Sequence, residues 1–174
     1  MRLNTCLAAL AATFVAATPA FAASTATATA EARGVVLQSL TLNKIKDLDF
    51  GTVAGDPSAG GHVIIDADTG ARSTTGSVVA LAGTFQRAQF DGFATPNVNV
   101  QISMSQPAGN VICNGAGCVN KIDAALNLDN GGPGVRNTGT TGAFSVFVGG
   151  DFTLTAAQPA GLYTAQFDVT AVYP

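Results

Sequence analysis

The sequence predicts an all-β sandwich, and three observations support this prediction. Short stretches rich in Val, Ile, Thr and Phe recur along the chain, and turn sequences separate them. Glycine accounts for 20 of the 174 residues, and many short strands joined by glycine-rich turns are typical of sandwiches and barrels. No stretch has the three-and-four apolar spacing of an amphipathic helix. We therefore expect one domain of packed antiparallel strands.

The first 22 residues have the pattern of a secretory signal peptide. Arg2 precedes an apolar run from Leu7 to Ala17, and Pro19-Ala20-Phe21-Ala22 provides the small residues of a cleavage site. The run is shorter than the roughly 20 apolar residues of a membrane span. We expect residues 1–22 to be removed on export and the mature chain to contain no transmembrane segment. It should reach the periplasm, and then the cell surface or the medium.

Residues 23–34 are expected to form an extension ahead of the sandwich domain, which we place at residues 35–174. From Ser24 to Ala30 the extension alternates strictly between hydroxyl residues and Ala, with no large side chain. Two interpretations stay open. The segment is a flexible terminus, or it adds as a strand to another subunit's sheet, with Val35 or Val36 and Leu37 as its larger residues.

The expected strands follow in order after this extension. Apolar residues from 35 to 50 predict one or two strands, broken near Asn43-Lys44. Further strands are expected at 62–66, 77–81, 84–90, 97–104, 111–113, 119 or 121–128, 143–148 and 151–154. The turn signals between them include Asp68-Thr69-Gly70, Asp91-Gly92, Pro107-Ala108-Gly109, Asp129-Asn130-Gly131-Gly132 and Gly149-Gly150-Asp151.

The last strand, expected at 161–173, has the cleanest alternation in the sequence. Its apolar face consists of Tyr163, Ala165, Phe167, Val169, Ala171 and Tyr173, and its polar face of Thr164, Gln166, Asp168 and Thr170. This pattern predicts a half-buried strand. No further strand follows it in the sequence, so we expect it to lie at an open edge.

Cys113 and Cys118 are the two cysteines that remain once Cys6 leaves with the signal peptide. In an oxidising compartment they should form a disulfide across the glycine-rich turn that separates them. Because the closed loop is short, its contribution to stability should lie at the low end of about 2–4 kcal/mol.

Composition argues against several classes of function. Charged residues make up 11% of the chain, against about 25% in ordinary soluble proteins. The positive ones are scattered, so we expect no nucleic-acid binding. A pI near 4.7 with few charges suits an exported protein that packs against copies of itself.

Sequence motifs give no reason to expect catalysis, a cofactor or a metal. Asp66-Ala67-Asp68-Thr69-Gly70 resembles the start of a calcium loop but lacks the later ligands, and a polar turn explains it better. His62 is the single histidine, and no Gly-x-Ser-x-Gly elbow is present to hold a serine nucleophile. We therefore expect a protein that is not an enzyme.

Three stretches resemble a known family. They are Leu48-Asp49-Phe50-Gly51-Thr52-Val53, Gly70-Ala71-Arg72-Ser73-Thr74-Thr75-Gly76, and Pro159-Ala160-Gly161-Leu162-Tyr163 with the alternating tail that follows. Together they resemble the secreted bacterial family known as domain of unknown function 4402, over essentially the whole mature chain. The two ends are also similar to the spore coat protein U domain and to archaic chaperone–usher pilins.

The resemblance to such pilins implies an immunoglobulin-like sandwich whose final strand is absent. It also implies partners: a periplasmic chaperone that first fills the groove beside the last strand, an outer-membrane usher, and another subunit whose N-terminal extension then replaces the chaperone. In this chain the strand-accepting edge would be lined by Phe167, Val169, Ala171 and Tyr173.

Two functional hypotheses follow. The first is a non-enzymatic exported structural subunit, fimbria-like or coat-like, that assembles with copies of itself or related subunits by β-strand addition. The alternative is a self-complete secreted β-sandwich that acts as a binding module or adhesin for a surface glycan or protein. Phe85, Phe90 and Phe93 are the aromatic candidates for a glycan site, although we expect Phe90 and Phe93 to lie in the core.

Overall fold

The computed structural model describes residues 25–115 and 117–174, so the expected signal peptide at residues 1–22 lies outside the described part of the chain. The chain divides into two units, residues 1–35 and 36–174. Residues 25–35, the described part of the first unit, form no helix or strand and have exposed side chains. Within it, the Arg33 guanidinium lies 2.9 Å from the Glu31 carboxylate. The remaining description concerns residues 36–174.

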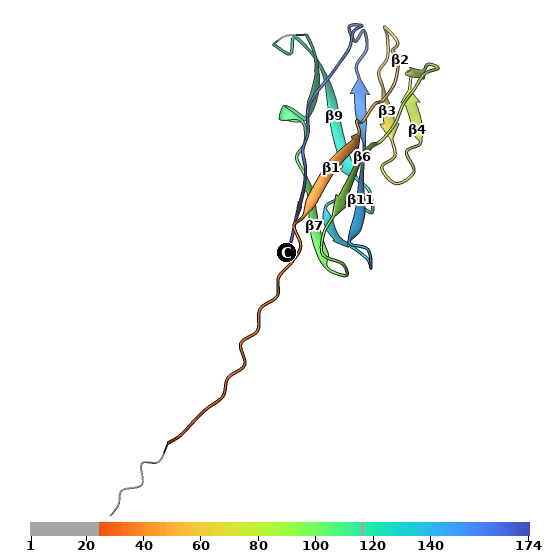
Figure 1. The fold of residues 1–174 in the computed structure, drawn as a ribbon. Helices are drawn as coiled ribbons and strands as arrows, with labels where there is room; N and C mark the ends of the chain where they lie inside the picture. The colour runs from red at the N-terminus through yellow and green to blue at the C-terminus, as the bar shows by residue number, and fades with distance from the viewer. Residues whose placement is uncertain (1–24, 116) are drawn as a thin grey trace, which may run out of the picture. The chain divides into compact units, whose positions relative to one another are not determined.

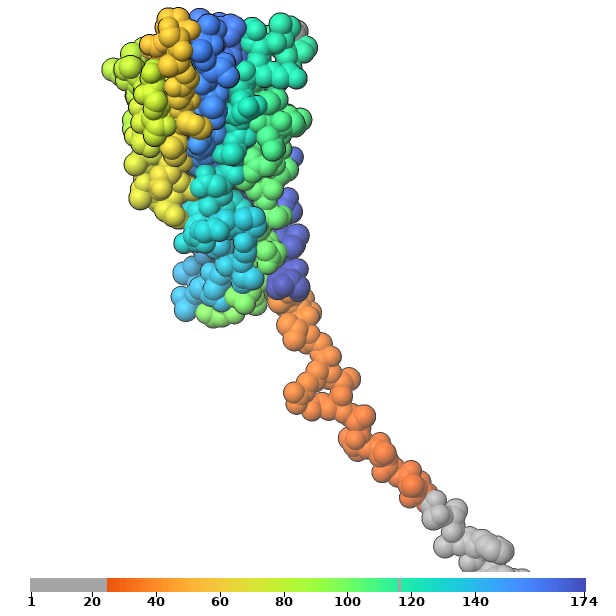
Figure 2. All heavy atoms as spheres, turned by 180° about the vertical axis from the view of Figure 1, so that it is seen from behind, coloured from red at the N-terminus to blue at the C-terminus, as the bar shows by residue number. Residues whose placement is uncertain are grey.

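The second unit is all-β, and every strand pair in it is antiparallel (Figure 1). The larger sheet runs in the order β1 (Thr41–Lys46), β6 (Ala88–Phe93), β11 (Ala143–Leu154), β3 (Gly61–Ile65) and β4 (Arg72–Gly76). On the other edge of β11 lies β9 (Asn120–Leu128), which also pairs with β8 (Val111–Asn114). Figure 2 shows the back of this sheet, with β4, β3, β11 and β9 side by side.

The smaller sheet has the order β10 (Gly134–Asn137), β7 (Asn99–Met104) and β12 (Val169–Val172). A separate ribbon pairs β2 (Val53–Ala54) with β5 (Val79–Ala80), and a short 3₁₀ helix, η1 (Ala108–Asn110), precedes β8. The order β1-β6-β11-β9 in one sheet, facing β7-β12 in the other, is that of an immunoglobulin-like sandwich, in which strands A-B-E-D face C-F-G. In that scheme β12 occupies position F.

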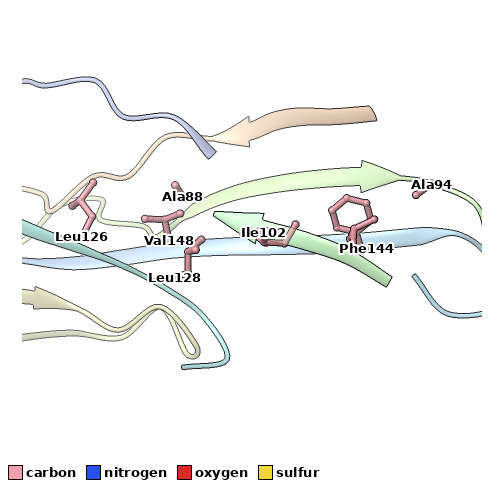
Figure 3. Packing of buried hydrophobic residues seen from close by; sticks show 9 residues of the cluster. Ala88, Ala94, Ile102, Leu126, Leu128, Phe144 and Val148 are labelled. Atoms are coloured by element: carbon pink, nitrogen blue, oxygen red, sulfur yellow. The ribbon is translucent and has the colours of Figure 1, made fainter. Parts of the chain in front are cut away.

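The main core lies between the two sheets. Ile102 of β7 is fully buried against Val146 and Val148 of β11, and Figure 3 shows Ile102 among side chains contributed by β6, β9 and β11. Inward residues of β9 are buried at every second position, as in Ile122, Ala124, Leu126 and Leu128. This period of two is what one buried sheet face requires. The sequence prediction of an all-β sandwich is therefore confirmed.

A second buried cluster fills the other end of the larger sheet. It contains Val63, Val78, Ile122, Ala124, Phe152 and Leu154. Phe50 meets Phe152 edge to face, with ring centroids 4.6 Å apart, a favourable aromatic geometry. The partly buried residues that pack against this second cluster do not come from the smaller sheet; they are Phe50, Val53, Ile112 and Tyr163. The segment from Phe50 to β2, the strand β8 and the segment that contains Tyr163, rather than strands of the smaller sheet, therefore cover this end.

Several expected strand boundaries were wrong, and close packing of glycine explains the clearest case. The expected turn at Gly149-Gly150-Asp151 lies inside the continuous strand β11. A Cβ atom at Gly149 would collide with the Ile65 carbonyl, and one at Gly150 would approach the Leu126 side chain. These glycines are required because neighbouring chains lie against the strand, and they form no turn.

Other differences concern the edges of the sheet. The expected turn at Asp91-Gly92 lies inside β6, and β1 continues through Asn43-Lys44, with a register shift between Lys44 and Lys46. Three short strands, β2, β4 and β10, were not expected. The last strand is shorter than expected: β12 covers Val169–Val172, and the stretch before it makes a single bridge, between Thr164 and Cys113.

Candidate strand-accepting groove

Two strand edges remain unpaired on one side of the sandwich. β12 pairs with β7 through one edge, and β1 pairs with β6 through one edge. Within residues 36–115 and 117–174, no strand pairs with the other edge of either. In Figure 1 the final, dark blue segment runs beside β1, and residues of both line one cavity. Both edges therefore present backbone N–H and C=O groups without a ladder partner.

The larger of two cavities on this side has a volume of about 930 Å³. One wall is the segment 47–57, which follows β1, and the other is the segment 157–167, which leads into β12. Its floor is apolar and includes Ile112, Ile122, Leu126, Phe152 and Leu154. Most of these floor residues belong to the second buried cluster or pack against it. The cavity thus opens onto a part of the core that no strand of the smaller sheet covers.

A smaller cavity of about 540 Å³ continues in the direction of β12. Its apolar lining includes Leu42, Phe90 and Val169, and its polar lining includes Lys44, Lys46 and Asp168. Asp47, Ala165 and Phe167 line both cavities. The two cavities therefore form one groove between the β1 side and the β12 side, which we call the β1–β12 groove.

Of the four residues predicted to line the accepting edge, Phe167 and Val169 line the β1–β12 groove, whereas Ala171 and Tyr173 line neither of its cavities. All four alternate along the end of the chain and pack against the main core, but each is only half-buried. By contrast, the inward residue Ile102 of the neighbouring strand β7 has no exposed surface. Phe167 meets Phe90 edge to face across the smaller cavity, with ring centroids 6.2 Å apart. The core therefore has an incomplete cover along β12.

One end of the groove is closed by hydrogen bonds. The Tyr173 hydroxyl donates to the Gln38 carbonyl at 2.9 Å and accepts from the Thr95 amide at 2.9 Å. The Gln38 amide in turn donates to the Thr95 hydroxyl at 2.6 Å. These bonds join the residue after β12 to the segment before β1 and close this end, whereas the larger cavity lies at the opposite end, beyond Ala165.

The wall of the groove formed by the segment 157–167 is held in place by the disulfide hairpin. Cys113 is bonded to Cys118, as the sequence predicts, with a Cα–Cα distance of 4.8 Å. The Cys113 and Thr164 backbones exchange two hydrogen bonds, of 3.0 Å and 2.8 Å. Gly161 lies so close to the Asn114 side chain that a Cβ atom there would collide with it. Gln158 adds a bond of 3.0 Å to the Tyr163 hydroxyl. The segment 158–164 is thereby fixed as a wall.

The structure brings His62 together with a carboxylate that sequence reasoning did not assign to it. His62 Nδ1 lies 3.0 Å from Asp151 Oδ1 and 3.2 Å from Thr153 Oγ1. These side chains project from neighbouring strands β3 and β11 and are partly exposed. No serine or cysteine side chain bonds to His62 in the described residues. The pair therefore lacks an adjacent serine or cysteine nucleophile.

The Asp66 loop is a polar turn. Asp66 Oδ1 accepts bonds from the Thr69 hydroxyl at 2.7 Å and the Thr69 amide at 2.6 Å. Both bonds lower the pKa of the Asp66 carboxyl from its usual value of 3.8, and the bond from the Thr69 hydroxyl has the larger effect. Over residues 25–115 and 117–174, no three His, Cys, Asp or Glu side chains gather as metal ligands.

The aromatic candidates for a glycan site do not gather into one surface. Phe90 packs partly buried against the main core, as expected. Phe93 is 46% exposed, so the expectation that it lies in the core was wrong: it sits at the end of β6, where its side chain points away from the core. Phe85 lies under the Arg72 guanidinium, 4.5 Å from the ring centroid. Phe90 is the one of the three that lines the β1–β12 groove.

Sequence reasoning missed the β1 side of the groove. Leu42, Leu48 and Phe50 pack partly buried against the core, opposite the accepting strand. The spacing of Leu40, Leu42, Leu48 and Phe50 by even numbers was the available signal, since it places them on one face of an extended chain. Sequence alone does not show that this face lies opposite β12.

Comparisons with known proteins place these features in a family. A family model described as "Domain of unknown function (DUF4402)" matches residues 40–173, a span that contains both sides of the groove. No curated protein and no solved structure matches the chain. Among the described residues, none of the helices has the length and apolarity needed to cross a membrane.

Proposed function

Because the chain belongs to the DUF4402 family, whose description assigns no function, we propose a function from its geometry: it is a structural subunit that assembles by accepting an extended strand in the β1–β12 groove. The observation that carries the proposal is the half-buried inward face of β12 beside an unpaired backbone edge. An edge of this kind recruits a strand, because main-chain hydrogen bonds and side-chain pockets act together.

The shape of the groove supports a strand as the occupant. An extended chain advances about 3.3 Å per residue, so about ten residues cover the length from Tyr163 to Tyr173. One edge of such a strand completes the ladder of β12, and its inward side chains cover Phe167 and Val169. The strand would take position G of the immunoglobulin-like order, between β12 and β1.

The source of the strand is a second copy or a related subunit. The extension before β1 alternates between Ala on one face and Thr, Glu or Arg on the other, which is the pattern of a half-buried strand. We propose that the protein is exported through its N-terminal signal peptide and joins a fimbria-like or coat-like surface structure. Before assembly the open groove needs a cover, the role that the sequence resemblance assigns to a periplasmic chaperone.

The proposed role is not enzymatic. The groove's floor is apolar, and the polar residues of its smaller cavity include two lysines and two aspartates at its rim. The His62–Asp151 pair lies on β3 and β11 of the larger sheet. β11 contributes Phe152 and Leu154 to the larger cavity, but neither His62 nor Asp151 lines either cavity. Strand recognition uses the groove as it is, without a reacting group.

The test compares the exported chain with a variant that lacks residues 24–33. Size-exclusion chromatography with light scattering and electron microscopy should find multimers or fibres of the exported chain and compact monomers of the variant. Equal circular dichroism spectra and thermal midpoints would show that the variant keeps its fold. Two compact monomers of equal stability would contradict assembly and direct attention to a surface glycan or protein ligand.

A further inference from the structure

We propose that residues 30–36 of a second copy of this chain occupy the β1–β12 groove antiparallel to β12, with Arg33 directly opposite Asp168. This inference rests on the proposed function and adds to it the donor segment, its direction and its register. Four observations carry it: the alternation of the donor, the position of the single acid on the outer face of the accepting segment 165–171, the order of side-chain sizes, and the position of the larger cavity at one end of the groove.

The alternation decides which face of the donor points inward. One face carries Ala30, Ala32, Gly34 and Val36, and the other carries Thr29, Glu31, Arg33 and Val35. If the second face pointed inward, the charged side chains of Glu31 and Arg33 would lie over Phe167 and Val169, which pack against the main core, and burial of unpaired charge is costly. The even-numbered residues therefore face the core, and Glu31 and Arg33 face solvent beside the outer face of β12.

Charge then selects the register. The outer face of the accepting segment carries Gln166, Asp168 and Thr170, of which only Asp168 is charged. With Arg33 opposite Asp168 in an antiparallel pair, opposite charges are direct cross-strand neighbours, which is stabilising. A shift of two residues in one direction places Glu31 opposite Asp168, so that like charges repel. A shift in the other direction leaves Asp168 opposite Val35.

The same register matches large residues to small ones on the inner face. Val36 falls opposite Ala165, where the two cavities meet, and Gly34 falls opposite the bulky Phe167. Ala32 and Ala30 fall opposite Val169 and Ala171. Each pair thus holds at most one large side chain, as close packing between facing positions requires. Val36 is 94% exposed in the single chain and loses that exposure in this position.

The position of the larger cavity supports the antiparallel direction. The closed end lies at Tyr173, whose hydroxyl is bonded to Gln38, and the larger cavity lies beyond Ala165. An antiparallel donor places its alanines at the closed end and Val36 at the larger cavity. A parallel donor would place Val36 at the closed end and leave the larger cavity to alanine. Antiparallel ladders are also slightly more stable per residue.

Cysteine trapping tests the register directly. Residues directly opposite in an antiparallel pair have Cβ atoms about 4.5–5.5 Å apart, close to what a disulfide needs. A chain with Val36→Cys mixed with one carrying Ala165→Cys should form an intermolecular disulfide, and so should Glu31→Cys with Thr170→Cys. The exchanged combinations, Val36→Cys with Thr170→Cys and Glu31→Cys with Ala165→Cys, should not. Equal trapping in all four combinations would overturn the register.

Exchanging the charges of Arg33 and Asp168 tests the register independently of cysteine trapping. Arg33→Asp or Asp168→Arg alone should weaken association about threefold to tenfold, and the double variant should restore it to within about twofold. Arg33→Asp combined with Asp123→Arg is the matched control, because Asp123 is exposed on β9 and does not line the groove. It should not restore association.

The two proposals fail in different ways. Multimers that form but trap at other positions, or that ignore the charge exchange, would overturn the register and leave strand acceptance standing. A chain that stays monomeric at every concentration would overturn both.

Discussion

The hydroxyl of Tyr173 donates a hydrogen bond of 2.9 Å to the carbonyl of Gln38, and so joins the last strand of the sandwich to the segment before the first. The same hydroxyl accepts from the Thr95 amide at 2.9 Å. These contacts cross the gap between the two sheets at the one end where the β1–β12 groove is closed. The groove therefore has one closed end, and its larger cavity lies at the other end.

Tyr173→Phe should lower the free energy of unfolding by about 1 kcal/mol, because it removes both bonds and keeps the ring in place. Urea unfolding measures the loss, and hydrogen exchange of the Thr95 amide should become faster. Tyr163→Phe is the matched control, since its hydroxyl donates to the Pro159 carbonyl in another loop. If Thr95 exchanges at the same rate in both variants, the hydroxyl does not hold this end.

Gly92→Ala should destabilise the sandwich by about 1–3 kcal/mol through overpacking. A Cβ atom at Gly92 would overlap the ring of Phe144, which is buried in the main core. Gly134→Ala is the control: its Cβ would come no nearer than 4.0 Å to another side chain, that of Arg136. Thermal unfolding of both variants compares them, and equal midpoints would contradict the steric explanation.

Gly92 and the pair Gly149-Gly150 also show which features of the fold cannot be predicted from the sequence alone. The pairs Asp91-Gly92 and Gly149-Gly150 look like turns, because glycine and aspartate favour turns, yet both lie inside strands. What fixes them is the approach of Phe144 or of the Ile65 carbonyl from distant parts of the chain. A sequence does not show which backbone segments will lie against each other.

In the candidate site, too, features set by local sequence pattern were predicted, and features set by contacts between distant segments were not. The alternation from Phe167 to Tyr173 predicted the inward face of the last strand, since the period of two is a local property. The disulfide followed from compartment and count. The opposite wall, with Leu48 and Phe50, depends on how the segment after β1 is placed in space, and it was found only in the structure.

Loss of the disulfide should loosen the wall of the groove more than the core. In a Cys113→Ser, Cys118→Ser variant, we expect a loss of about 2 kcal/mol in unfolding free energy, since the closed loop is short. Hydrogen exchange at the Thr164 amide should accelerate, because this amide donates to the Cys113 carbonyl at 2.8 Å. The amide of Ile102, in the centre of β7, is the internal reference. Equal acceleration at both amides would show general destabilisation instead.

Acid should remove the contribution of the Asp66 turn. The Thr69 hydroxyl and amide hold the pKa of the Asp66 carboxyl below 3.8, so the folded state favours the ionised form. Its contribution is then fully present above the unfolded pKa and is lost as pH falls through the folded pKa. In urea unfolding, Asp66→Asn should therefore differ from the natural chain at pH 7, and the difference should disappear as the pH falls through the folded-state pKa of Asp66. Thr69→Val should raise the pKa of Asp66 in an NMR titration; an unchanged pKa would contradict the assigned cause.

Filling the junction of the two cavities should block assembly without unfolding the protein. Ala165 lines both cavities and is exposed, so the side chain introduced by Ala165→Trp enters the groove rather than the core. It would occupy the space that an incoming strand needs beside Phe167. We expect multimers to disappear in light scattering while the thermal midpoint stays nearly constant, because exposed positions tolerate substitution. Ala125→Trp is the matched control, an exposed alanine on β9 that lines neither cavity. Its multimers should match those of the natural chain. If Ala165→Trp assembles as well as Ala125→Trp, the incoming strand does not use this groove, and contact between copies must be sought on another face.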